Sequence, residues 1–148
     1  MPKALVAFAL AAMVAMPTAV FAADHQVMMV NKDAEGRPMQ FEPAYLKVAP
    51  GDTVTFVVKD KGHNSETIAG KIPEGAEAWK GKISKEITVT LNAAGYYAYK
   101  CQPHLAMGMV GLIEVGEAGE PDVAVLTDKL PGKAKTRMEE LIAEAQEQ

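Results

Sequence analysis

The sequence has very little cysteine, because only one of its 148 residues, Cys101, carries a thiol. An intrachain disulfide is therefore impossible, and stability has to come from a packed core, for which one domain of this length suffices. The sequence also lacks an excess of positive charge, since 15 Lys and Arg residues face 19 Asp and Glu residues. Nucleic-acid binders need a basic surface to neutralise phosphates, so the composition argues against that class.

Long hydrophobic runs are missing too, with one exception near the start of the chain. Residues 4–15 are apolar and follow a single lysine, but this run is shorter than the roughly 20 residues that span a bilayer. Residues 20–22 (VFA) put small or branched side chains where a signal peptidase cuts. We expect residues 1–22 to be a cleaved signal peptide and the protein to be periplasmic. The mature chain would begin at Ala23 or Asp24, and an uncleaved membrane anchor is the alternative.

The segment between residues 25 and 115 has the pattern of an all-β domain. Short runs that alternate or are rich in β-branched and aromatic residues are separated by Gly, Pro and Asn turns, which is typical of a sandwich or barrel. The runs lie at 26–31, 45–48, 53–58, 87–91, 96–100 and 110–115. Residues 70–84 show no clear period, and we expect a loop there with a short helical turn. We therefore expect one domain over 23–148, with its β-strands over about 24–116.

The end of the chain has a helical pattern. A first helix is predicted from Pro121 to about Asp128, and Pro131-Gly132 then interrupts the chain. The apolar residues that follow share one face of a second helix, which would pack on the sheets. They are Ala134, Met138, Leu141, Ile142 and Ala145. We therefore expect a helical extension over about 120–147.

The residues with the most distinctive chemistry surround the single cysteine. Cys101, His104 and Met109 have the spacing C-x2-H-x4-M between two expected strands, and His63 follows the strongest core strand. A thiolate, two imidazoles and a thioether favour copper, because two His and one Cys with a weak axial Met form a blue-copper site. Zinc accepts the first three ligands, but a thioether suits it poorly. The set therefore predicts one copper ion cycling between Cu(I) and Cu(II).

Two further residues are candidates near this site. Met107 competes with Met109 as the axial ligand, although its position better suits a solvent-facing apolar contact with a partner. Asn64 follows His63, and its side-chain amide could tie the two ligand segments together. Two other functions use the same residue types: a copper chaperone or storage protein, and a thiol enzyme with Cys101 as nucleophile. The sequence has no exposed Met-rich or His-rich metal motif for the first and no residue placed to orient a base for the second.

On these motifs the sequence resembles the cupredoxins (type 1 blue copper proteins), and within them the pseudoazurins. The segments that carry the resemblance are 41–44 (FEPA), 49–53 (APGDT), 60–64 (DKGHN), 72–75 (IPEG), 100–104 (KCQPH) and 107–110 (MGMV). The helical end favours pseudoazurins over plastocyanins, which stop at the last strand. The resemblance implies a Greek-key β-sandwich with two C-terminal helices and copper held by His63, Cys101, His104 and Met109, with Asn64 tying the ligand segments.

The resemblance also implies a function without catalysis. Such a protein would be a monomeric periplasmic shuttle that carries single electrons to copper nitrite reductase during denitrification. His104 would be the electron port, and lysines around it would steer the acidic partner. The lysines that match by motif position are Lys32, Lys61, Lys80 and Lys100. Gln102 and Leu105 depart from the family pattern, and so do Asp33 and Glu35 beside the first of these lysines.

Overall fold

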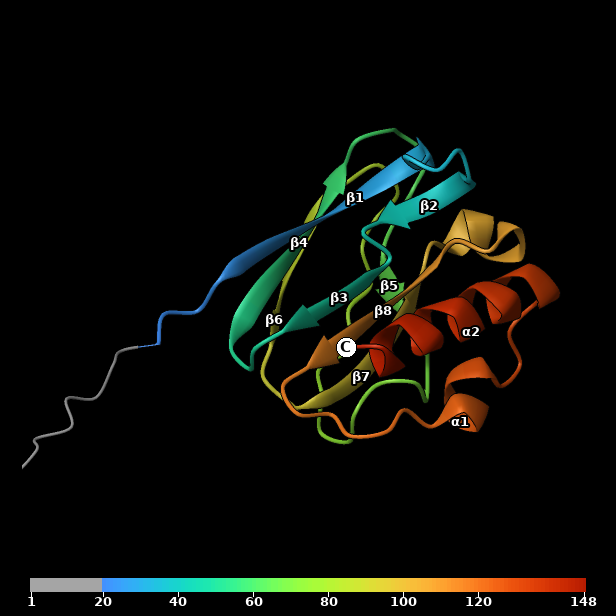
Figure 1. Cartoon of the computed structure of the whole chain (residues 1–148). Coiled ribbons are helices and arrows are strands. Elements are labelled where there is room, and N and C mark those ends of the chain that lie inside the picture. Colours follow the sequence, from blue (N-terminus) through green and yellow to red (C-terminus); the bar gives the residue numbers. More distant parts are fainter. Residues whose placement is uncertain (1–19) are drawn as a thin grey trace, which may run out of the picture.

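A computed structural model describes residues 20–148, so the expected signal peptide, residues 1–22, lies almost entirely outside the described part. Figure 1 shows the elements in chain order. They are β1 (Asp24–Lys32), β2 (Pro38–Glu42), β3 (Tyr45–Val48), β4 (Asp52–Val58), β5 (Glu66–Thr67), β6 (Ile87–Leu91), β7 (Gly95–Lys100), the 3-10 helix η1 (Gln102–Met107), β8 (Val110–Val115), α1 (Val123–Thr127) and α2 (Gly132–Gln146). Within this range no helix has the length and apolarity that crossing a bilayer requires.

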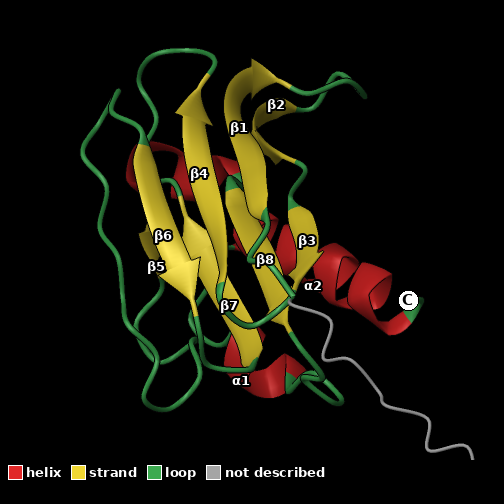
Figure 2. Ribbon diagram, turned by 90° about the vertical axis from the view of Figure 1, so that its left-hand side faces the viewer, coloured by secondary structure: helices red, strands yellow, loops and turns green. Residues whose placement is uncertain are grey.

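The strands form two four-stranded sheets that face each other, as Figure 2 shows. One sheet has the order β2-β1-β4-β6 and the other β3-β8-β7-β5. Two neighbouring pairs, β1 with β4 and β3 with β8, run parallel, and parallel neighbours need long crossover connections. The chain therefore passes repeatedly between the sheets. The predicted mainly-β sandwich with two C-terminal helices is confirmed.

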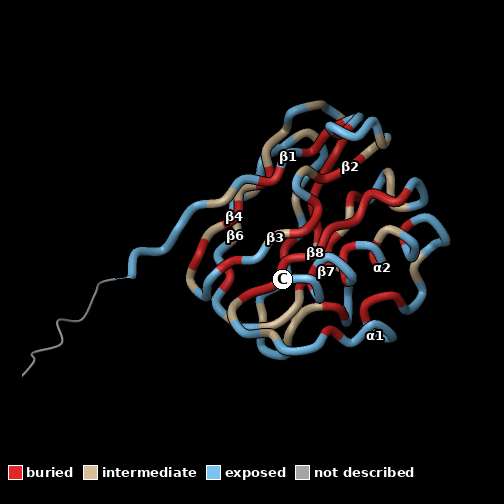
Figure 3. The backbone as a smooth tube through the Cα atoms, viewed as in Figure 1, coloured by how far each residue is buried: buried red, intermediate tan, exposed pale blue. Residues whose placement is uncertain are grey.

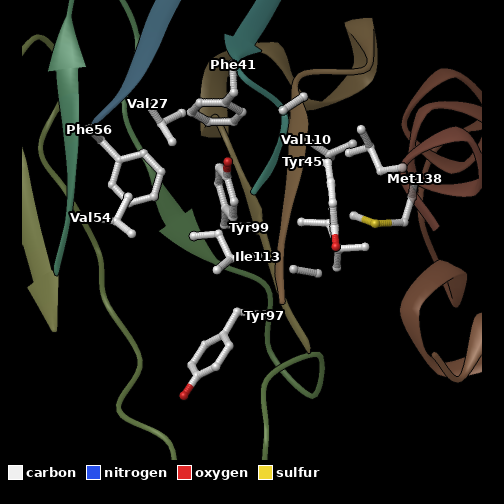
Figure 4. Packing of buried hydrophobic residues seen from close by; sticks show 14 of the residues in the cluster. Val27, Phe41, Tyr45, Val54, Phe56, Tyr97, Tyr99, Val110, Ile113 and Met138 are labelled. Atoms are coloured by element: carbon white, nitrogen blue, oxygen red, sulfur yellow. The ribbon is translucent and has the colours of Figure 1, made fainter. Parts of the chain in front are cut away.

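The core fills the space between the two sheets, and aromatic rings dominate its centre (Figure 4). The Tyr99 ring packs edge-on against Phe41 and Phe56, with centroids 4.7 and 5.0 Å apart. Trp79 stacks on Phe56 at 5.7 Å. Because inward-facing residues alternate with outward-facing ones, burial alternates along β4 and β1, as the red and tan or blue segments of Figure 3 show.

Helix α2 covers the second sheet from outside, and α1 packs against α2. The Asp122 side chain caps α1 by accepting a hydrogen bond from the Val125 N–H at 3.0 Å. Helix α2 packs on β8 and η1 with one apolar face. The buried residues of that face are Ala134, Met138, Leu141, Ile142 and Ala145, the same residues that the 3.6-residue period predicted.

Local structure differs from the sequence reading in three places. Residues 70–84 contain turns but no helical turn, so that expectation was wrong. The loop after Cys101 contains η1, which the sequence reading treated as an irregular connection. The short edge strands β2 and β5 were also not predicted.

Candidate metal centre

The loop between β7 and β8 places Cys101 and Met109 side by side at one end of the sandwich. The Cys101 N–H donates to the Met109 carbonyl at 3.0 Å, which closes the loop at its base. Between them, Pro103 lies in the first turn of η1, where its missing N–H does no harm. Gly108 ends η1 with φ of 89°, a left-handed conformation that favours glycine. The local sequence thus folds the C-x2-H-x4-M segment back on itself.

Three donor atoms meet at this end of the sandwich. Cys101 Sγ lies 3.7 Å from His63 Nδ1 and 3.5 Å from His104 Nδ1, and the two Nδ1 atoms are 3.1 Å apart. A point at equal distance from all three lies about 2.0 Å from each, close to the lengths of about 2.0–2.3 Å that metal–nitrogen and metal–sulfur bonds take. The triangle therefore fits one metal ion without rearrangement.

Burial sets the protonation of the two innermost donors. His63 is fully buried, and this burial, together with the charge of His104, lowers its pKa, so the ring stays neutral and able to bind metal. His63 Nε2 lies 2.8 Å from Asn31 Oδ1. This contact places the ring proton on Nε2 and leaves the Nδ1 lone pair facing the centre. Burial also raises the pKa of the Cys101 thiol, so a metal has to displace its proton.

The structure separates the two candidate axial methionines. Met109 is completely buried, and its N–H donates to the His104 carbonyl at 3.2 Å. Met107 is 40% exposed at the end of η1. Only Met109 is therefore held inside the protein beside the donor triangle, whereas Met107 faces solvent.

Asn64 connects the two ligand segments, as its position next to His63 had suggested. Its Oδ1 accepts from the Gln102 N–H at 2.7 Å, directly after Cys101. Its Nδ2 donates to the Gly81 carbonyl and to Glu66 Oε2, both at 3.1 Å. The side chain is almost fully buried. It therefore fixes the distance between the segment of His63 and the segment of Cys101.

The four predicted docking lysines all lie at the metal end of the sandwich. Lys32 follows the Asn31 that contacts His63, Lys61 precedes His63 by two residues, and Lys100 directly precedes Cys101. Lys80 forms an isolated backbone bridge with Glu66. Lys32, Lys61 and Lys80 are exposed. Lys100 is only partly exposed, with its Nζ 3.5 Å from a carboxylate oxygen of Glu66, so its charge is partly compensated.

The acidic residues beside Lys32, Asp33 and Glu35, form ion pairs with Arg37. Arg37 Nε donates to Asp33 Oδ2 at 2.7 Å, and its NH2 group lies 3.1 Å from a Glu35 oxygen. These acids therefore reduce the local positive charge less than the sequence suggested, because Arg37 compensates one negative charge.

The sequence reading missed two residues that hold His63 in place. Asn31 contacts its Nε2, and the Ser84 N–H donates to the His63 carbonyl at 2.8 Å. The Ser84 hydroxyl also accepts from the Gly62 N–H at 2.8 Å. Both residues are far from His63 in the sequence, and no local pattern marks an Asn at the end of a strand or a Ser in a turn as its partner. Only the fold brings them together.

A family model described as copper binding proteins of the plastocyanin/azurin family matches residues 27–116, which include all four predicted ligands. This chain belongs to that family. It is 46% identical to the pseudoazurin of Paracoccus pantotrophus, over 93% of this chain and 94% of the relative. It is 43% identical to a putative pseudoazurin of Rhizobium leguminosarum bv. viciae, over 92% and 89%.

Solved structures show the same similarity. The pseudoazurin of Sinorhizobium meliloti superposes with a TM-score of 0.78 and 53% identity, covering 83% of this chain and 96% of that one. The resemblance to the cupredoxins and to pseudoazurins is thereby confirmed, and family membership makes copper the metal of this site. The donor triangle agrees with that metal, since a thiolate between two imidazoles is the equatorial set of a blue-copper site.

Proposed function

We propose that this chain is a periplasmic type 1 copper protein that carries single electrons and is not an enzyme, with His63, Cys101, His104 and Met109 as ligands. The observation that supports this most directly is the triangle of Cys101 Sγ and two Nδ1 atoms with sides of 3.1 to 3.7 Å. Copper supplies a couple between Cu(I) and Cu(II) when it is bound there. The family and the pseudoazurin relatives support the proposal.

The protein's own residues would keep the site nearly unchanged as an electron passes. Hydrogen bonds from His63 Nε2 to Asn31 Oδ1 and from the Gln102 N–H to Asn64 Oδ1 hold two of the ligand segments before any metal is present. Cys101 and Met109 are completely buried, which keeps water away from the sulfur atoms. His104 is the one equatorial donor residue that is partly exposed. It offers the shortest path from the site to a docked partner.

A copper chaperone or storage protein is the alternative, and the burial of the donors disfavours it. Metal transfer between proteins needs donors that a second protein can reach. Cys101, His63 and Met109 each have no exposed surface, so the metal could leave only after local opening. A carrier of electrons has no such requirement.

Absorption spectroscopy tests the copper site. We expect Cu(II) to give the purified protein an intense visible thiolate-to-copper band that ascorbate bleaches and that Cys101→Ser removes. A colourless protein that binds Zn(II) equally well would refute the carrier. Met109→Gln should lower the reduction potential, because a harder axial ligand favours Cu(II). The control Met107→Gln should leave the potential unchanged. If Met107→Gln lowered the potential and Met109→Gln did not, Met107 would be the axial ligand instead of Met109.

We also propose that copper nitrite reductase accepts the electron. The support is the location of Lys32, Lys61, Lys80 and Lys100 at the metal end, where positive charge would attract an acidic partner. An apolar centre with a charged rim suits a small, short-lived interface, and a monomer leaves the port free. Residues 1–22 support export to the periplasm, where such a partner would be met.

Stopped-flow mixing of the reduced protein with purified copper nitrite reductase tests this pairing. The second-order rate should fall as salt is added, because screening weakens attraction between exposed charges. Lys61→Gln should slow the reaction and flatten its salt dependence. The matched control is Lys47→Gln, an exposed lysine of β3 that pairs with Glu114 near the opposite end of the sandwich. Equal effects of the two variants, or no reaction, would refute the proposed docking.

A further inference from the structure

Asp52 is a buried carboxylate at the end of the sandwich opposite the metal centre. It begins β4 and is 5% exposed, whereas the metal centre lies beyond the other end of this strand, about 20 Å away at 3.3 Å per residue. Its Oδ1 accepts from the Ala23 N–H at 2.8 Å. Its Oδ2 lies 2.8 Å from His25 Nε2 and accepts from the Ala49 N–H at 3.0 Å. None of these contacts has a part in holding copper.

Ala23 is the first residue that the sandwich holds. The Thr53 N–H donates to the Ala23 carbonyl at 3.0 Å, and the parallel pairing of β1 with β4 begins at the next residue. Val20 and Phe21 are 88% and 87% exposed. The chain before β1 extends away from the sandwich, as the pale blue segment of Figure 3 shows. The chain therefore changes from unsupported to firmly paired between residues 22 and 23.

We propose that Asp52 is the binding site for the α-ammonium group that forms when the Ala22–Ala23 peptide bond is cleaved. The inference rests on the export proposed above. In the step, a signal peptidase hydrolyses this bond with one water molecule. The carboxylate remains on Ala22 and departs with residues 1–22. The nitrogen remains on Ala23, takes up a proton and becomes an ammonium group at the place where its N–H already meets Asp52 Oδ1.

The structure favours cleavage of the Ala22–Ala23 bond over cleavage of the Ala23–Asp24 bond. Cleavage after Ala23 would remove the donor to Asp52 and also the acceptor of the Thr53 N–H. The sequence agrees, because a cut after Ala22 puts Val20 at the third position before the bond, whereas a cut after Ala23 puts the bulky Phe21 there. Cleavage between Ala22 and Ala23 leaves every hydrogen bond of β1 in place.

The new charge would strengthen a contact that already exists. The Asp52 acceptor is already ionised, and cleavage would ionise the donor too, so attraction between opposite charges would add to the hydrogen bond. The described groups around Asp52 that carry or can carry charge are His25, on its Oδ2, and Asp24, whose carboxylate bonds to the Thr53 hydroxyl. Neither Ala49 nor Leu91, which pairs with Asp52 from β6, brings a charge. The ammonium would therefore bind the Asp52 carboxylate, whose other oxygen contacts the His25 imidazole.

The first experiment determines the N-terminus and its titration. The full chain is exported in a bacterium, and the mature protein is examined by intact mass and N-terminal sequencing, which should find Ala23 first. In the copper-loaded protein labelled with 13C-alanine, the Ala23 methyl signal should titrate above the ordinary α-amino range of about 7.7–8.0. Cleavage at another bond, or a titration within the ordinary range, would overturn the proposal. An intact chain would overturn the export proposal as well.

The second experiment isolates the contact. Asp52→Asn, which keeps the shape but not the charge, is compared in a chain that begins at Ala23 and in one that begins at Phe21. The substitution should lower the thermal midpoint more in the Ala23 chain, and this extra loss should disappear above the α-amino pKa. The visible copper band, unchanged in all four proteins, confirms folding. Equal losses in the two chains would overturn the proposal.

Discussion

Removing the side chain of Asn64 should destabilise the protein markedly, because this buried amide makes three hydrogen bonds. A typical hydrogen bond contributes about 0.5–1.5 kcal/mol to folding, and a partner left unsatisfied costs more. Gln102 is an exposed residue that water can reach, and Glu66 keeps Lys100 as a partner. These two contacts lower the cost of the unsatisfied partners. We therefore expect Asn64→Ala to reduce the free energy of unfolding by about 2–4 kcal/mol, roughly a 30- to 700-fold change in the folding equilibrium.

Equilibrium urea unfolding of the apoprotein measures this loss, since the single tryptophan, Trp79, is buried and reports on the core. The matched control is Asn92→Ala, an exposed residue after β6 whose side chain makes no hydrogen bond within residues 20–148. We expect that control to change stability by less than about 0.5 kcal/mol. Copper-loaded Asn64→Ala should also have a shifted visible band, because Gln102 follows Cys101. An unfolding free energy equal to that of the control would refute the reasoning.

Two further predictions concern the core and the far end of the sandwich. Gly111→Ala should cost about 1–3 kcal/mol, because its Cβ would overlap the hydroxyl-bearing edge of the Tyr99 ring. Gly132→Ala, with open space around it, should not destabilise. Equal urea midpoints for the two variants would contradict this. The Ala23 N–H and then His25 lower the pKa of Asp52 to about 2. Its stabilising effect should therefore be present above pH about 4 and be lost as the pH falls towards 2. The urea midpoints of the parent and Asp52→Asn should then converge in acid, and a constant difference would contradict the cause given.

Much of the fold could be predicted from the sequence because its signals are local. The alternation in 87–91 predicted β6, the β-branched and aromatic residues of 53–58 predicted β4, and the 3.6-residue period predicted the buried face of α2. Edge strands give weaker signals. Strand β2 begins with a proline and contains Met39 with φ of 50°, and β5 has only two residues. Neither is long enough for a period to show, and both are strands only because a neighbour pairs with them.

The sequence by itself determined the chemistry of the candidate site: one thiolate, two imidazoles and a thioether at a spacing that favours copper. Tertiary structure decided what depends on distant residues. It buried Met109 and left Met107 in solvent, brought Asn31 to His63, and placed the Ala23 N–H on Asp52. Donor type and spacing are properties of a short segment. Burial and hydrogen-bond partners arise between strands about 30 residues apart, so they exist only once the sandwich has closed.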